Sequence, residues 1–142
     1  MKYLIIILLW AVVMTNCKTM EKTTASKEVT IYCYPLTKFT KIPITIYSIK
    51  SAAEDTFVYS DKKGLMGRIV GALEVSPNVA DSVFLKGQVR VAITTVEYAP
   101  IYLDRASHIM YNEKIYVCTD GLYSMLSQFF PANKRSRYLD CQ

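Results

Sequence analysis

Alternation of apolar and polar positions along the chain predicts several short strands. The period is two over residues 29–34 and 42–47, and it is clearest over residues 88–98. Side chains of a strand point alternately to its two faces, so this period is typical of strands that bury one face. Runs rich in β-branched and aromatic residues predict further strands at residues 56–60, 108–111 and 114–119. The last two flank Asn112-Glu113 and predict a hairpin.

Helical periodicity is confined to short segments. Ser76-Pro77 is typical of a helix start and Gly87 of the residue past a helix end, which predicts a short helix between them. Asp120 can cap another helix, in which apolar residues recur at i, i+3, i+4 and i+7: Leu122, Met125, Leu126 and Phe129. Residues 65–75 fit either a helix or a bent strand, because two glycines interrupt the helical pattern.

These elements predict an α+β domain with a mostly antiparallel sheet of five to seven strands and one or two short helices. The chain has 142 residues, of which 51% are hydrophobic and 20% charged, so it can bury one proper core. We expect a single globular domain over residues 29–142.

The N-terminus has the pattern of an export signal. Lys2 precedes the uncharged, mostly apolar residues 3–14. A membrane-spanning helix needs about 20 apolar residues, so this run suits the apolar centre of a signal peptide better.

The segment from Lys2 through the apolar run 4–13 to Met14-Thr15-Asn16-Cys17 resembles the signal of bacterial lipoproteins. The resemblance implies cleavage before Cys17, with residues 1–16 as the signal peptide, and a lipid on the Cys17 thiol. Asn16 stands where that class usually has Gly, Ala or Ser, so unlipidated secretion and an uncleaved anchor stay open. Lys18 replaces the Asp that often retains such proteins at the inner membrane, which implies the outer membrane.

Residues 17–28 are polar, rich in Thr and Lys, and without periodicity. We interpret them as a flexible, lipid-anchored tether. The eleven residues after Cys17 could span about 36 Å when fully extended.

The formal net charge is +5, which favours anionic partners. The densest positive group is Lys134, Arg135 and Arg137, a possible binding group or a solvated tail. No helix or strand collects the charge, so we do not expect nucleic-acid binding.

Catalytic chemistry has little support in the sequence. His108 is the single histidine, and the predicted hairpin brings it near Cys118. A cysteine nucleophile with His108, or a pair of acids drawn from Glu54, Asp55 and Asp81, is the enzyme alternative. No metal-ligand spacing and no phosphate-binding glycine loop occurs, so we expect no metal and no cofactor.

The cysteines predict a disulfide, because export places the domain where disulfides persist. If Cys17 carries a lipid, three thiols remain and at most one pair forms. Cys118 with Cys141 and Cys33 with Cys118 are the two pairings that we consider. Without lipidation, all four cysteines could pair.

Eleven tyrosines are the unusual feature of the composition. On an exposed sheet face they provide rigid amphipathic area for a protein or a sugar, and Tyr32, Tyr34 and Tyr47 are candidates. The alternative is that they fill positions where strands favour aromatics. We therefore expect a lipid-anchored, non-enzymatic protein that binds an envelope protein or a surface glycan. A soluble secreted ligand-binding or inhibitor protein is a further alternative.

Overall fold

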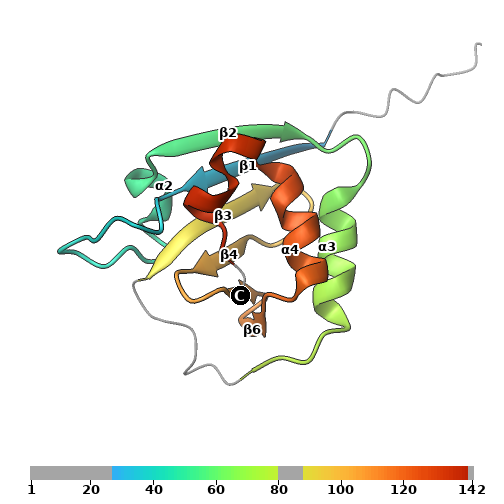
Figure 1. Cartoon of the computed structure of the whole chain (residues 1–142). Coiled ribbons are helices and arrows are strands. Elements are labelled where there is room, and N and C mark those ends of the chain that lie inside the picture. The colour runs from blue at the N-terminus through green and yellow to red at the C-terminus, as the bar shows by residue number, and fades with distance from the viewer. Residues whose placement is uncertain (1–26, 80–87, 141–142) are drawn as a thin grey trace, which may run out of the picture.

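The computed structural model describes residues 27–79 and 88–140. These residues form one six-stranded sheet in the order β2-β1-β3-β4-β5-β6, with every neighbouring pair antiparallel (Figure 1). The strands are β1 (Glu28–Cys33), β2 (Asp55–Ser60), β3 (Val89–Thr95), β4 (Ile101–Asp104), β5 (His108–Tyr111) and β6 (Lys114–Val117). The expected α+β fold with a mostly antiparallel sheet is confirmed.

The described residues also form four short α-helices, which is more than the one or two expected from the sequence. They are α2 (Ile49–Ala52), α3 (Leu65–Glu74), α4 (Asp120–Leu126) and α5 (Arg135–Tyr138). The 3₁₀ turns η2 (Ser127–Phe129) and η3 (Ala132–Lys134) connect α4 to α5. None of these helices is long and apolar enough to cross a membrane.

One face of the sheet, here the helical face, carries the main core. The helices α3 and α4 pack on it together with the C-terminal segment (Figure 1). In β1 the inward side chains are fully buried, as the alternation over residues 29–34 predicts: Val29, Ile31 and Cys33. Each fully buried aliphatic side chain contributes about 1.5–3 kcal/mol, so this face dominates the stability of the domain.

The opposite face, here the loop face, carries a smaller apolar cluster under α2 and the segment that precedes it. Its buried members are Ile44, Ile49, Val89, Ala92 and Ile115. Side chains that pack against this cluster stay partly exposed, among them Tyr32, Tyr34, Tyr102 and Met110. The loop face is therefore covered less completely than the helical face.

The predicted strand over residues 42–47 is wrong. Only Ile44 makes a single parallel bridge, to Gln88, and a turn then leads into α2. Thr45 and Ser48 redirect the backbone, because Ser48 Oγ accepts a hydrogen bond from Thr45 N at 2.9 Å and Thr45 Oγ1 accepts one from Tyr47 N at 3.2 Å. Such side-chain bonds compete with a strand ladder.

The ambiguous residues 65–75 form the helix α3. Its start is held by Asp61, whose carboxylate oxygens accept hydrogen bonds from Leu65 N at 2.6 Å and Met66 N at 2.8 Å. Gly64 precedes the helix with φ of 65°, a left-handed conformation that favours glycine.

Two further segments differ from the expectation. The helix predicted after Ser76-Pro77 is not present in its described part, where Val79 instead bridges to Ile115 of β6, and residues 80–87 lie outside the described residues. The sequence did not predict β4, because Ala99-Pro100 is typical of the end of a strand. In the structure Ala99-Pro100 lies between β3 and β4, two strands that pair with each other.

The predicted hairpin between β5 and β6 is confirmed. Asn112 and Glu113 both have positive φ, 48° and 62°, which is typical of a type I′ turn. The predicted helix at residue 120 is also present as α4, but its cap is Thr119, whose Oγ1 accepts the hydrogen bond of Leu122 N.

Candidate functional site

The tyrosines proposed from the sequence as binding residues lie on or beside the loop face. Tyr32 extends from β1, and Tyr34, two residues later, packs against the same apolar cluster. Tyr47 lies in the turn before α2 and is 90% exposed. Tyr102, from β4, packs against the same apolar cluster as Tyr32 and Tyr34. The pKa of Tyr102 is raised by partial burial and, to a smaller extent, by Tyr47.

Positive side chains cover several rings of this face. Lys50 Nζ lies 5.7 Å from the ring centre of Tyr32, and Arg90 Cζ lies 5.1 Å from that of Tyr34. Arg105 Cζ lies 4.2 Å from the ring centre of Phe39, a residue that the sequence reasoning did not single out. A guanidinium or ammonium over a ring is attracted by its negative face, with about 0.5–1 kcal/mol at exposed sites.

Arg90 is the most unusual side chain of the loop face. It is 2% exposed, although arginine is almost never fully buried unless it is paired. Its Nη2 donates to Lys38 O at 3.2 Å and weakly to Gln88 Oε1 at 3.4 Å. Sequence reasoning missed Arg90 because it occupies an ordinary alternating position of a clear strand.

The single histidine is held by a buried carboxylate. Asp104 Oδ2 lies 3.0 Å from His108 Nδ1, and Asp104 Oδ1 accepts hydrogen bonds from the backbone N–H groups of Ala106 and His108. These bonds fix the turn between β4 and β5. A histidine held by a carboxylate supplies two members of a hydrolytic triad, but the thiol considered as its nucleophile, Cys118, is disulfide-bonded.

The structure overturns the enzyme alternative that combined Cys118 with His108. Cys118 belongs to the core of the helical face and is disulfide-bonded, so it presents no thiolate. His108 pairs with Val117, and successive strand positions point to opposite faces. The partner of the Cys118 disulfide lies outside the described residues, as does Cys141 of the predicted pair.

The alternative disulfide between Cys33 and Cys118 is wrong. Cys33 is a free cysteine, fully buried in β1. Burial raises the pKa of its thiol well above the ordinary value, and the nearby Asp55 carboxylate raises it further. Such a thiol stays protonated and is a structural rather than a reactive cysteine.

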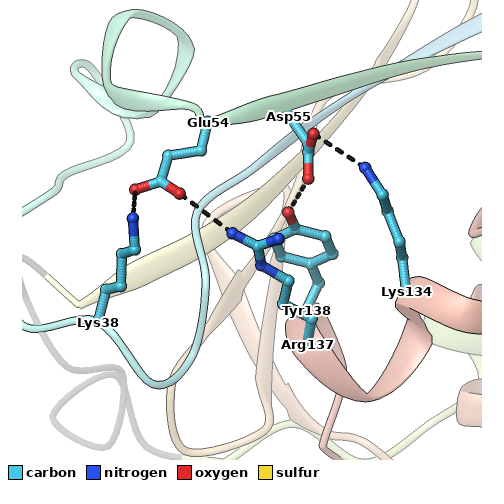
Figure 2. Close-up of polar contacts among 6 residues, drawn as sticks. All are labelled: Lys38, Glu54, Asp55, Lys134, Arg137 and Tyr138. Atoms are coloured by element: carbon cyan, nitrogen blue, oxygen red, sulfur yellow. Dashed lines mark hydrogen bonds and ion pairs between the residues drawn. The ribbon is translucent and has the colours of Figure 1, made fainter.

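The basic group near the C-terminus is largely engaged in contacts with the rest of the domain. Figure 2 shows Lys134 paired with Asp55 at 3.1 Å and Arg137 paired with Glu54 at 3.3 Å. Tyr138 OH donates a hydrogen bond to Asp55 in the same group, which joins α5 to the start of β2. Arg135 Nε donates to Phe130 O. Lys134 and Arg137 therefore act as structural cations, and the segment is not a free tail.

The acid pair suggested by the sequence is used in the same contacts. Glu54 bridges Lys38 and Arg137, and Asp55 contacts Lys134 and Tyr138 (Figure 2). Hydrogen bonds from Tyr138 and Lys134 lower the pKa of Asp55, so it remains an ionised structural carboxylate. Asp81, the third acid considered, lies outside the described residues.

Among the described residues no three histidine, cysteine or acidic side chains are grouped so that they could hold a metal ion. The chain matches no protein-family model, and no curated protein or solved structure is significantly similar to it. The loop face is the candidate functional site.

Proposed function

We propose that this chain is an exported, non-enzymatic binding protein, held at a bacterial envelope by a lipid on Cys17. Its binding surface is the loop face of the sheet, and its partner is an envelope protein or a surface glycan. The observation that carries the binding role is that Tyr32, Tyr34 and Tyr102 share the less covered face, while Tyr47, in the turn that leads into α2, is 90% exposed.

The chemistry of this cluster supports a binding surface. Tyrosine offers a large rigid area with a polar end, so it contributes contact energy at a low entropic cost. Tyr47 is almost fully exposed, as are Ile42 and Phe39 earlier in the same loop. The cations Lys50 and Arg105 add a positive charge that suits an anionic partner.

The anchor and tether are inferred from the sequence. The resemblance to lipoprotein signals covers residues 1–17, which lie outside the described residues, as do residues 18–26 of the tether. β1 begins at Glu28, one residue before the start expected for the domain. The alternative is a soluble secreted binding protein, which differs from the proposed one only in lacking the lipid on Cys17.

Intact mass of the membrane-associated form tests the anchor. We expect a chain that begins at Cys17 and carries additional acyl mass. A chain that begins elsewhere without added mass contradicts the anchor and leaves the secreted form.

Co-purification from detergent-solubilised membranes, at the natural expression level, tests the binding role. We expect the wild-type chain to retain a partner and Tyr47→Glu to lose it. Val75→Glu is the matched control, because Val75 is also exposed but follows α3, away from the loop face. Recovery of the wild-type chain alone, or equal retention by both variants, contradicts the proposed binding surface.

A further inference from the structure

The side chain of Arg90 has hydrogen-bond donors that the rest of the chain does not use. Its Nε and Nη1 atoms are buried and have no hydrogen-bond partner. Leaving a buried donor without a partner destabilises a fold, and more so when the group is charged. Such a group in a folded protein calls for an explanation, for example a bound ion or water.

A second guanidinium lies in the same region and makes the charge imbalance larger. Arg105 N donates to Gln88 O, two residues before Arg90 in the chain. The pKa of Arg90 is lowered by burial and by the nearby positive charge of Arg105. In the described part of the chain neither arginine has a carboxylate within ion-pair distance. Within residues 27–79 and 88–140, two like charges, one of them buried, therefore have no ion-pair partner.

Aromatic rings hold the flat faces of both guanidinium groups. Arg90 lies over Tyr34 and Arg105 over Phe39. With the faces against rings, the N–H groups at the edges remain for hydrogen bonding. A guanidinium edge is matched to two oxygens of a carboxylate or phosphate.

We propose that Arg90 and Arg105 form a binding site for a phosphate group, at the end of the sheet where β3 begins and β4 ends. A phosphate monoester carries about −1.5 to −2 charges at pH 7, so it can neutralise both guanidinium groups, whereas a carboxylate neutralises one. The proposal names a ligand chemistry for the loop face and so rests on its proposed binding role, but it does not depend on the lipid anchor.

Because Arg90 Nη2 donates to Lys38 O, we expect access to the buried nitrogens of Arg90 to require a movement of the segment around Lys38. The free nitrogens of Arg90 are shielded from solvent, whereas Phe39 is 80% exposed. Two long hydrogen bonds, to Lys38 O and Gln88 Oε1, fix the Arg90 head group. We expect phosphate to contact Arg105, which is partly exposed, before it reaches Arg90.

Titration of the full chain in detergent with inorganic phosphate tests the site directly. Nitrogen-15 NMR at pH 7 follows the Nε–H signal of Arg90. We expect this signal to shift with saturable dependence on phosphate, and we expect equal concentrations of acetate at matched ionic strength to leave it unchanged. Absence of a phosphate-dependent shift, or an equal shift with acetate, overturns the proposal.

Charge-removing variants test which arginines bind. Arg105→Gln should weaken phosphate affinity by about tenfold or more, because a hydrogen bond to a charged group is lost. Arg68→Gln removes the same charge from an exposed position of α3 and should leave the affinity unchanged. Arg105→Gln is preferred to changes at Arg90, because replacing a side chain that is 2% exposed also perturbs the packing of the domain. Equal affinities of the two variants overturn the site.

Vesicles separate the two sources of a phosphate group. Binding of the unlipidated chain to phosphatidic acid vesicles, whose headgroup is a phosphate monoester, but not to phosphatidylcholine vesicles identifies a lipid headgroup, provided that it is lost in Arg105→Gln and kept in Arg68→Gln. Binding of inorganic phosphate without binding to either vesicle identifies a small phosphorylated ligand. If phosphate does not bind while co-purification still depends on Tyr47, the phosphate site is wrong and the proposed binding role stands.

Discussion

Tyr138→Phe isolates the contact that joins the C-terminal helix α5 to the sheet. The hydroxyl of Tyr138 donates a hydrogen bond to the Asp55 carboxylate, and the ring is 1% exposed against Phe57 and Phe130. Phenylalanine keeps the ring packing and removes only the hydroxyl. The change in the free energy of unfolding therefore reports this hydrogen bond.

The magnitude follows from the surroundings of the carboxylate. A hydrogen bond to a charged group contributes about 1.5–3 kcal/mol. The Asp55 side chain is 25% exposed and also pairs with Lys134, so water and a second partner compensate in part. We expect Tyr138→Phe to lower the free energy of unfolding by about 1.5 kcal/mol at pH 7. With a urea m-value of about 1–3 kcal/mol/M, the midpoint falls by about 0.5–1.5 M.

The pH dependence gives a sharper form of the same prediction. The pKa of Asp55 is lowered in the folded protein from its ordinary value of 3.8. The contribution of ionised Asp55 to the free energy of unfolding is therefore present above pH 3.8 and is lost as the pH falls through the lower pKa of the folded state. The pKa of Tyr138 is raised by burial and by Asp55, so its contribution is present up to its ordinary pKa near 10 and is lost at higher pH. The difference between Tyr138→Phe and wild type should therefore be largest near neutral pH and shrink below about pH 4.

Urea denaturation at pH 3, 5 and 7, followed by far-ultraviolet circular dichroism, measures these differences. Tyr47→Phe is the control, because its hydroxyl is removed from a side chain that is 90% exposed, and it should stay within about 0.5 kcal/mol of wild type. A Tyr138→Phe variant as stable as Tyr47→Phe at pH 7, or a difference that is the same at pH 3 and pH 7, refutes the reasoning.

Three further predictions concern the rest of the domain. Asp61→Ala leaves two backbone N–H groups at the start of α3 without their acceptor and should lower the free energy of unfolding by about 2 kcal/mol. The control Asp120→Ala, at an exposed helix start, should lower it by less than about 1 kcal/mol, and equal losses in urea denaturation contradict the prediction. We expect Cys118 to be bonded to Cys141, because the Ser107 hydroxyl donates a hydrogen bond to Asp140 O and the Ser107 carbonyl accepts one from Cys118 N. Cys141→Ser should then lower the free energy of unfolding by about 3 kcal/mol, and a peptide map that links Cys118 to another cysteine contradicts the pairing. The buried Cys33 thiol, with its raised pKa, should resist iodoacetamide at pH 8 in the native state and react in urea; rapid native labelling contradicts its burial.

Much of the sheet follows from the sequence alone, for a local reason. The alternation over residues 29–34 places one set of side chains in the core, and β1 forms there. A one-residue slip would expose that whole set, so the pattern determines both the strand and its buried face. β3 forms within residues 88–98 as predicted, but its first five residues are all buried, because both faces of the sheet are covered there. The turn at Asn112-Glu113 and the helix after Thr119 are likewise governed by nearby residues.

The candidate site depends on contacts between distant segments, which only the tertiary structure decides. The alternating positions over residues 42–47 suggest a strand, but hydrogen bonds of Thr45 and Ser48 turn the chain and leave Tyr47 exposed before α2. The pattern around Arg90 shows an arginine on the polar side of a strand. Only the packing of the loop face buries it and leaves its Nε and Nη1 without a hydrogen-bond partner. Alternation identifies which residues share a face, whereas burial and pairing depend on what covers that face, and that is set by residues far away in the chain.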